Sequence, residues 1–375
     1  MTPDPVEFSA SDYAMMARAL RLAERGAFTT KPNPMVGCVL AKDGVIVGEG
    51  WHHRAGGPHA EVFALEAAGE NARGATAYVT LEPCSHVGRT GPCADALLAA
   101  GVVRVVAAMR DPNPLVHGAG FDRLQAAGVT VQTGLMEPLA RQLNRAYLSR
   151  IERGRPWLRI KLAISLDGRS ALKSGDSKWI SGEASRQDVQ RWRARSGAIL
   201  TGAGTVLIDD PQLTVRLPPD APDYEREFVP PVRVVLDPGL ATVARGRVRE
   251  GDAPTLYIHA ADARMPRGVD ADHAHVPVQA GRFDLEAVLA LLAARDINEV
   301  QVEAGATLAG AFLAAGLVDE LLLYVAPVIL GEHARPMFEG LPIDTMAERL
   351  SMSIVETRRI GEDVRLLLQP KSTLA

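Results

Sequence analysis

The chain has 375 residues, of which 47% are hydrophobic and 23% are charged, and this length predicts two or three domains with real cores. Residues 1–154 hold 15 basic and 15 acidic side chains, and the remainder holds 26 basic and 30 acidic ones. Neither part has the basic excess of a protein that follows a phosphate backbone, so we expect no nucleic-acid partner. No apolar run reaches the roughly 18 residues that span a bilayer, and the first ten residues do not resemble a signal peptide. We therefore expect a cytoplasmic protein without a membrane partner.

The first half alternates helix and strand signals. Apolar side chains recur at helical spacing from Tyr13 to Leu20. Two apolar stretches, 36–40 and 45–47, flank Asp43-Gly44, which is a hairpin turn signal. Further helices are predicted at 59–68 and 93–100, and further strands at 78–81 and 102–107. Strands separated by helices predict a sheet covered by helices.

A charged stretch with Gly and Pro, residues 150–156, is predicted to be the linker between two α/β domains, 1–153 and 154–375. Strands are predicted in the second domain at 158–164, 198–201, 232–236, 256–258, 299–302 and 321–325. Helices are predicted at 188–195 and 285–294. Residues 217–230 are rich in Pro and Asp, which predicts a surface loop.

The strongest motif is His59-Ala60-Glu61, followed by Pro83-Cys84 and then Cys93. This ordered set is the signature of zinc-dependent deaminases. One imidazole and two thiolates leave the fourth position of Zn²⁺ open for water, whose pKa the metal lowers. We expect one zinc per chain, held by His59, Cys84 and Cys93, with Glu61 as the catalytic acid/base. Both ligand groups lie where helices are predicted to begin, and a helix start favours thiolate.

Other interpretations remain open on the residues alone. A structural zinc has four protein ligands, and His86 could be the fourth. A single His, Glu or Cys is more often a cap, a solvated side chain or a core residue. Cys38 lies in an apolar stretch and is expected in the core. Three cysteines are too few for a disulfide framework.

The two cysteines of the motif are separated by eight residues rather than by two. The segments KPNPMVGCVL, PHAEVFAL, LEPCSHVGRTGPCADALLAAGVVRVV and DPNPLVHGAG resemble the deaminase half of the bifunctional riboflavin-biosynthesis deaminase–reductases, in which this long spacer is usual. The resemblance continues through the second half and so covers essentially the whole chain. It implies a cytidine-deaminase-like three-layer domain followed by a dihydrofolate-reductase-like α/β domain, and also a homo-oligomer.

The resemblance also implies the reactions. Deamination of 2,5-diamino-6-ribosylamino-4(3H)-pyrimidinone 5′-phosphate would be followed by reduction of the ribosyl group of 5-amino-6-(5-phosphoribosylamino)uracil to ribityl, with NADPH as hydride donor. Asn33 in the Pro-Asn-Pro turn resembles a substrate contact, although a plain Asn-Pro turn explains it equally well. His52, His86 and Arg89 could contribute to a phosphate or base pocket, with solvated surface as the alternative.

Three segments carry the reductase resemblance, at 161–168, 201–216 and 303–310. The last is a Gly-rich turn from strand to helix, which can offer N–H groups to a phosphate but can equally serve close packing. By matched segment, cofactor contacts fall on Ala163, Trp179, Thr205, Asp209, Gly305, Ala306, Thr307, Leu308, Ala309, Gly310 and Ala311. Substrate contacts fall on Lys161, Ser177, Arg193, Leu213, Arg216 and Glu303. The guanidinium groups of Arg193 and Arg216 suit forked phosphate binding.

Two other functions compete with this interpretation. A nucleoside or tRNA deaminase with an accessory domain would carry the same zinc motif, but the neutral first half and the reductase segments argue against it. A zinc-stabilised binding module without catalysis would not need Glu61 beside only three obvious ligands.

Overall fold

The computed structural model describes residues 7–85, 91–114, 116–217 and 226–371. The chain divides into two units, which we describe separately. The first unit contains the chain up to Arg153 and, from a later segment, the described residues 226–229; the second contains the remainder.

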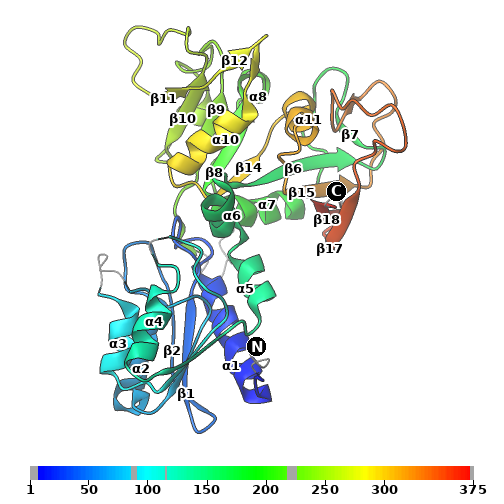
Figure 1. Ribbon diagram of the computed structural model, residues 1–375. Coiled ribbons are helices and arrows are strands. Elements are labelled where there is room, and N and C mark those ends of the chain that lie inside the picture. The colour runs from blue at the N-terminus through cyan, green and yellow to red at the C-terminus, as the bar shows by residue number, and fades with distance from the viewer. Residues whose placement is uncertain (1–6, 86–90, 115, 218–225, 372–375) are drawn as a thin grey trace. The chain divides into compact units, whose positions relative to one another are not determined.

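A five-stranded sheet of order β2-β1-β3-β4-β5 forms the centre of the first unit (Figure 1). Its strands are β1 (Gly37–Lys42), β2 (Val45–Trp51), β3 (Thr76–Val79), β4 (Arg104–Ala107) and β5 (Thr130–Thr133). β1 runs antiparallel to β2 and β3, whereas β3, β4 and β5 are parallel. Asp43 and Gly44, with φ of 50° and 78°, form the tight turn between β1 and β2, so the predicted hairpin is confirmed.

Helices cover both faces of this sheet. They are α1 (Ala10–Ala23), α2 (Ala60–Ala68), α3 (Cys93–Ala99), α4 (Ala119–Ala126), α5 (Glu137–Leu143) and α6 (Arg145–Arg153). Alternate residues of β1 enter two different cores, because successive strand side chains point to opposite faces. Val39 packs with α1, α5 and α6, while Cys38 and Leu40 pack with α2, α3 and α4. The expected three-layer arrangement, with Cys38 in the core, is therefore observed.

The predicted linker is partly wrong. Residues 150–153 form the last turn of α6, and only 154–156 lie between that helix and the next strand. Arg and Glu are good helix formers, and the helix buries Tyr147 and Leu148 with Ile151 packed beside them. Of the charges that suggested a linker, Glu152 and Arg153 lie on the exposed side of this amphipathic helix, whereas Arg150 is half-buried.

Two glycines of β2 allow α2 to lie very close to the sheet. A Cβ atom on Gly50 would lie 2.4 Å from the carbonyl oxygen of Ala60, and one on Gly48 would lie 2.2 Å from that of Ala64. Both distances are far below van der Waals contact. The depth of α2 against the sheet therefore depends on the absence of side chains at these two positions.

The second unit is built on a nine-stranded sheet of order β11-β10-β9-β8-β14-β6-β15-β18-β17. The strands are β6 (Trp157–Ser165), β8 (Ala198–Gly202), β9 (Val232–Leu236), β10 (Thr255–His259), β11 (Asp272–His275), β14 (Glu299–Val302), β15 (Glu320–Ala326), β17 (Met352–Ile360) and β18 (Asp363–Pro370). The run from β11 to β15 is parallel, and β18 and β17 continue it as an antiparallel hairpin.

Helices α7 (Glu183–Arg195), α8 (Ala203–Asp209), α10 (Leu285–Ala294) and α11 (Ala306–Ala314) accompany this sheet. Two short pairs complete the unit: β7 (Arg169–Ala171) with β16 (Arg335–Pro336), and β12 (Val278–Gln279) with β13 (Arg282–Phe283). The six predicted strands and the helix at 285–294 are confirmed. α7 begins five residues before its predicted start at 188, and the β17–β18 hairpin was not predicted.

Part of the predicted surface loop at 217–230 packs against the first unit. The Val229 N–H donates to the carbonyl oxygen of Phe28 at 2.9 Å, and Lys31 Nζ donates to the carbonyl oxygen of Val229 at 3.1 Å. Residues 218–225 lie outside the described residues. No helix in the described part of the chain is both long and apolar enough to cross a membrane.

Candidate active sites

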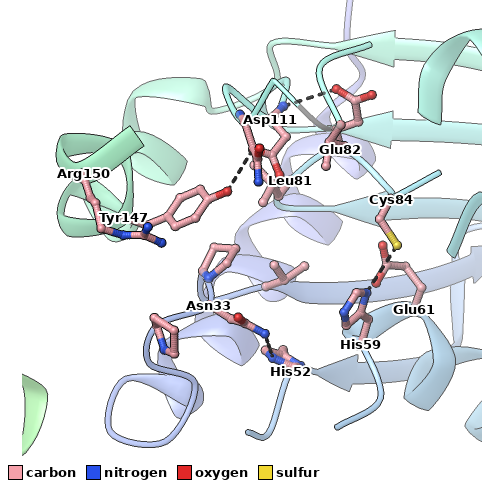
Figure 2. A pocket seen from close by; sticks show the side chains of 15 residues that line it. Asn33, His52, His59, Glu61, Leu81, Glu82, Cys84, Asp111, Tyr147 and Arg150 are labelled. Atoms are coloured by element: carbon pink, nitrogen blue, oxygen red, sulfur yellow. Dashed lines mark hydrogen bonds between the residues drawn. The ribbon is translucent and has the colours of Figure 1, made fainter. Parts of the chain in front are cut away.

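A cavity of about 220 Å³ opens in the first unit beyond the carboxyl ends of the parallel strands β3 and β4 (Figure 2). Ligands of α/β sheets commonly bind at such strand ends. The segment after β3 contributes Glu82 and Cys84, and the segment after β4 contributes Asp111 and Asn113. Among the described residues, the lining consists of Pro32, Asn33, Pro34, Val36, His52, His59, Glu61, Leu81, Glu82, Cys84, Asp111, Asn113, Val116, Tyr147 and Arg150.

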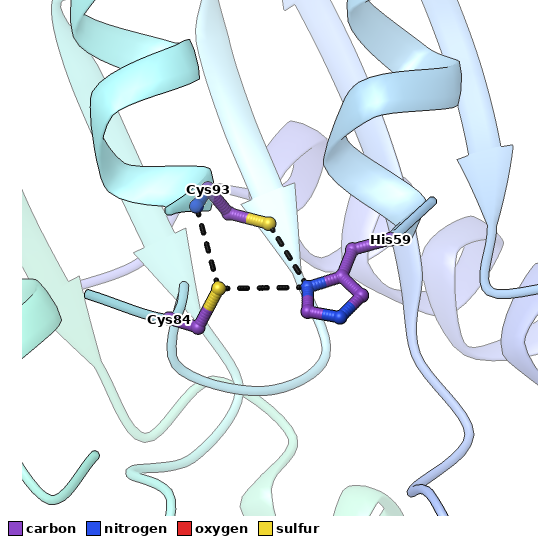
Figure 3. A group of neighbouring side chains, drawn as sticks. All are labelled: His59, Cys84 and Cys93. Carbon is purple, nitrogen blue, oxygen red and sulfur yellow. Dashed lines mark hydrogen bonds between the residues drawn. The ribbon is translucent and has the colours of Figure 1, made fainter. Parts of the chain in front are cut away.

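His59, Cys84 and Cys93 meet beside this cavity (Figure 3). His59 is the N-cap of α2, Cys93 is the first residue of α3, and Cys84 follows β3. His59 Nδ1 lies 3.2 Å from Cys93 Sγ and 3.5 Å from Cys84 Sγ, and all three ligand atoms lie within 4.8 Å of one another. These separations fit donors that bind one Zn²⁺ at about 2.0–2.3 Å. The three residues therefore have the spacing of a three-ligand zinc site.

Glu61 lies in the first turn of α2, two residues after His59, and lines the same cavity. Its side chain is buried, with 3% of the residue exposed. Oε2 has no hydrogen-bond partner among the described residues, and burial raises the pKa of this carboxyl group. A buried carboxylate normally has partners for both oxygens, so an unpartnered oxygen beside a metal cluster points to a proton acceptor for a bound molecule.

Asn33 and His52 also line the cavity, and the centroid of the His52 ring lies 5.3 Å from that of His59. His52 Nδ1 lies 3.0 Å from the carbonyl oxygen of Pro58, and His52 Nε2 lies 3.1 Å from Asn33 Nδ2. Burial lowers the pKa of His52, which favours the neutral ring. With the proton on Nδ1 for the carbonyl, Nε2 accepts from the Asn33 amide. His86 and Arg89, also considered from the sequence, lie outside the described residues.

Several lining residues were not predicted. Asp111 and Asn113 belong to a segment after β4 in which the Pro-Asn-Pro of residues 32–34 occurs a second time, and this repetition is the signal that could have identified them. Tyr147 donates its hydroxyl to Asp111 Oδ1 at 3.2 Å. Arg150 was assigned to the linker, but its place on α6 brings it to the cavity.

A larger cavity, of about 590 Å³, opens in the second unit at the carboxyl ends of β6, β8 and β14. Most of the predicted reductase residues line it: Lys161, Ala163, Ser177, Trp179, Arg193, Thr205, Asp209, Leu213, Glu303, Gly305, Ala306, Thr307 and Leu308. Ala309, Gly310, Ala311 and Arg216 are not among the described lining residues. The first three lie beyond the opening turn of α11, and Gly310 packs against the backbone of Glu339.

A buried charge cluster occupies the floor of this cavity. Arg193 donates from Nε to Glu303 Oε1 at 2.7 Å and from Nη2 to Oε2 at 2.8 Å, while Nη1 donates to the carbonyl oxygen of Thr214. Gln301 Nε2 donates to Glu303 Oε1 at 2.9 Å. Burial alone would raise the pKa of Glu303, but the charge and hydrogen bonds of Arg193 outweigh it and lower the pKa to about 2. Burial lowers the pKa of Lys161 beside it.

This arrangement changes the expected role of one arginine. The fork of Arg193 faces Glu303 rather than an open space for phosphate. Arg216 has an exposed side chain, with Nη1 donating to Gln212 Oε1 at 2.9 Å. Its backbone N–H donates to Gln190 Oε1 on α7. Of the two arginines, Arg216 is thus the one whose guanidinium is accessible to an anion.

The helix α11 begins at the cavity without a side-chain cap, since its N-cap residue is Gly305. The unpaired N–H groups at such a start suit a phosphate group. Three unpredicted cationic side chains, those of Lys178, Arg186 and Arg335, also line the cavity. Trp179 is 70% exposed, and the Cζ atom of Arg186 stacks over its ring at 4.6 Å from the ring centroid. The size, cations and uncapped helix of this cavity fit a dinucleotide cofactor.

Fold and sites together define a two-domain enzyme, in which a zinc-dependent deaminase precedes an α/β reductase. Two family models match the chain: the cytidine and deoxycytidylate deaminase zinc-binding region over residues 9–109, and the RibD C-terminal domain over residues 156–366. The riboflavin biosynthesis protein RibD of Escherichia coli K12 is 49% identical over 95% of this chain and 99% of its own length. That of Haemophilus influenzae is 44% identical over 98% and 99%.

Solved structures agree with these sequence relatives. Acinetobacter baumannii RibD superposes with a TM-score of 0.88 at 44% identity, covering 96% of this chain and 99% of that one. A Thermotoga maritima protein described as a diaminohydroxyphosphoribosylaminopyrimidine deaminase/5-amino-6-(5-phosphoribosylamino)uracil reductase gives 0.84 at 34% identity, with the same coverage. The chain belongs to the RibD family of bifunctional riboflavin-biosynthesis enzymes. Its cofactors are zinc and NADPH, and the accessory-domain deaminase and the binding module are not favoured.

Proposed function

We propose that the first-unit cavity deaminates 2,5-diamino-6-ribosylamino-4(3H)-pyrimidinone 5′-phosphate and that the second-unit cavity reduces the product. The observation that carries this proposal is the pair of sites in one chain: a three-ligand cluster with a buried acid, and a larger cavity with a Glu–Arg–Lys floor. The name of the Thermotoga relative states the same two activities.

In the deaminase site, His59, Cys84 and Cys93 would hold the zinc ion, which supplies the Lewis acidity that makes water nucleophilic at neutral pH. Glu61 accepts a proton from the attacking water through Oε2 and passes it to the ring nitrogen. It then takes the second proton from the hydroxyl group now on C2 and delivers it to the departing amino group, so that C2 becomes a carbonyl carbon and ammonia leaves. Burial of Glu61 keeps bulk water from competing for this proton.

The wall of the deaminase cavity orients the substrate. Asn33 would meet the ring or the sugar, because its amide is fixed by His52 at the cavity edge. A fixed amide loses little side-chain entropy when the substrate binds. The neutral His52 ring keeps the direction of that amide constant near neutral pH.

In the reductase site, NADPH supplies the hydride. The open start of α11 would receive a cofactor phosphate, with Ala163, Trp179, Thr205 and Asp209 around the remainder of the cofactor. Arg216 would take the substrate phosphate, in place of the shared role first assigned to Arg193 and Arg216.

Glu303 faces the carbon that accepts the hydride in this proposal. The bond between C1′ and the ring oxygen must break, with a proton going to that oxygen, and this leaves a positively charged iminium group at C1′ and its nitrogen. The hydride then adds to C1′ and neutralises this charge. The Glu303 carboxylate stabilises this charge, and Arg193 and Gln301 hold it in place. Lys161, buried beside Glu303, has the lowered pKa that suits a proton donor.

We further propose that the protein acts in the cytoplasm as a homo-oligomer, with a small pyrimidine nucleotide as its only partner besides the cofactor. The two cysteine ligands stay reduced in the cytoplasm, which supports that location. The nearly equal numbers of basic and acidic residues in each half support the absence of a nucleic-acid partner. Light scattering on the purified chain tests the oligomeric state, and a mass equal to one chain would contradict it.

The decisive experiment is ammonia release from the diaminopyrimidine nucleotide, followed with and without NADPH. We expect release in both conditions and NADPH oxidation only after the deaminated nucleotide has formed. Release of ammonia from cytidine or from tRNA, without release from the diaminopyrimidine nucleotide, would refute the proposal. The catalytic role of zinc would be refuted if the purified protein contained no zinc. It would also be refuted if a fourth protein ligand occupied the open coordination position.

A further inference from the structure

The Glu82 carboxylate lies at the edge of the deaminase cavity and has a use that the proposed mechanism does not include. It belongs to the segment between β3 and the ligand Cys84, and 4% of the residue is exposed. A carboxylate buried to this degree is costly unless its oxygens are hydrogen-bonded. Its partners therefore indicate what it does.

Within the described part of the chain, the hydrogen-bond partners of this carboxylate are three backbone N–H groups of one distant segment. Oε2 accepts from the N–H of Asp111 at 3.3 Å and from that of Gly118 at 3.0 Å, and Oε1 accepts from the N–H of Gly120 at 3.1 Å. Figure 2 shows the Glu82 carboxylate directed at the Asp111 backbone. One carboxylate thus holds both ends of the segment 111–118, whose Asp111, Asn113 and Val116 line the cavity.

The start of α4 explains why this carboxylate is needed. The N-cap residue of α4 is Gly118, which has φ of 86° and no side chain to cap the helix. The first N–H groups of a helix require an acceptor, and a negative charge there is favourable. Glu82 supplies both from outside the helix. Close packing enforces the contact, because a Cβ atom on Gly120 would lie 1.9 Å from the carbonyl oxygen of Pro83.

We infer that Glu82 is a positioning residue of the deaminase: it fixes the cavity wall formed by Asp111, Asn113 and Val116 relative to the zinc ligands. This inference rests on the proposed deaminase function of the cavity. Both oxygens of Glu82 face N–H groups, so the side chain acts on the substrate through the wall and not by contact with the reacting atoms. Holding both ends of a short segment removes most of its conformational freedom before the substrate binds.

The test is Glu82→Gln in the full chain. A Gln amide has one acceptor oxygen, so its NH₂ group must face at least one of the three N–H donors. We expect the wall to loosen, with KM for the diaminopyrimidine nucleotide raised roughly tenfold, which corresponds to about 1.4 kcal/mol. The variant should retain its zinc content, a kcat within about threefold of wild type, and the reductase rate, because the three hydrogen bonds that weaken lead to residues 111, 118 and 120 and not to the zinc ligands.

Glu66→Gln is the matched control, since Glu66 is an exposed residue of α2 in the same unit. An unchanged KM in Glu82→Gln would overturn the inference, and so would loss of zinc from the folded variant, which would mean that Glu82 supports Cys84 instead. If wild-type protein releases no ammonia from the nucleotide, the proposed function fails, and the two failures are thereby distinguished.

Hydrogen exchange on the wild-type chain tests the same inference should the variant fail to fold. We expect the amides of Asp111, Gly118 and Gly120 to exchange at least a hundredfold more slowly than the same sequence in a free peptide. Exchange at the free-peptide rate would overturn the inference, because the three N–H groups would then have no lasting acceptor.

Discussion

Replacing Glu303 with Gln tests the charge cluster of the reductase cavity. Glu303 and Arg193 form a two-pronged ion pair in which each side chain is 11% exposed. The pKa of Glu303 falls from its usual 4.5 to about 2. A tenfold change in an ionisation constant corresponds to about 1.4 kcal/mol, so ionised Glu303, with Arg193, Lys161 and Gln301 around it, contributes about 3 kcal/mol to stability relative to its protonated form. Removing one partner of a buried pair typically costs ~3–5 kcal/mol, which is the same size.

The expected result is a lower melting temperature for the second unit. In a unit of this length, 1 kcal/mol shifts the melting temperature by roughly 2–4 °C, so Glu303→Gln should lower it by about 6–12 °C at pH 7. The reductase activity should be lost, whereas the deaminase rate and zinc content should not change. Glu362→Gln is the control, since Glu362 is exposed on the same unit.

The dependence on pH gives a second measurement. Because the folded-state pKa of Glu303 lies below the unfolded value, its stabilisation is complete above pH 4.5 and is lost as the pH falls towards 2. Calorimetry of both proteins should therefore show a difference in melting temperature that narrows between pH 5 and pH 3. Equal melting temperatures at pH 7, or a difference that does not depend on pH, would refute this account.

Three other predictions concern the two sites. Glu61→Gln should reduce ammonia release by ~10²–10⁴-fold while zinc stays bound, and near-normal release would rule out its acid/base role. Arg216→Lys keeps the charge but loses the two-pronged donor, so KM for the deaminated nucleotide should rise while KM for NADPH stays constant. A change confined to the KM for NADPH would place Arg216 at the cofactor. A chain of residues 1–153 contains the three proposed zinc ligands and should deaminate the nucleotide. Its KM should be higher, because it lacks residues 226–229 beside Phe28 and Lys31. A KM equal to that of the full chain would show that this contact is dispensable.

The zinc site could be predicted because its information is local. His59 and Glu61 are two residues apart at a helix start, and Cys84 and Cys93 flank one connection. Their order in the chain, together with two predicted helix starts, was enough to bring them together. The strands with strong apolar patterns, such as β9 and β14, were predictable for the same reason.

Contacts between distant segments could not be read from periodicity. Arg193 and Glu303 are 110 residues apart, and either one alone looks like an ordinary charged residue. Glu82 and Gly120 are likewise joined only by the fold. β17 was missed because it is largely exposed and lacks a clear two-residue pattern, so the apolar signal of a strand is weak there.

The glycines at 48 and 50 have a consequence for anyone who wishes to re-engineer the deaminase. Since His59, the proposed metal ligand, caps α2 and Glu61, the proposed acid, lies in its first turn, a methyl group at Gly50 would have to lift both residues together as one body. Misplacement by about 1 Å can cost ~10²-fold in rate. Substitutions that change the substrate range are therefore expected in the loops that line the cavity and not in β2. Mutant libraries should leave that strand unchanged.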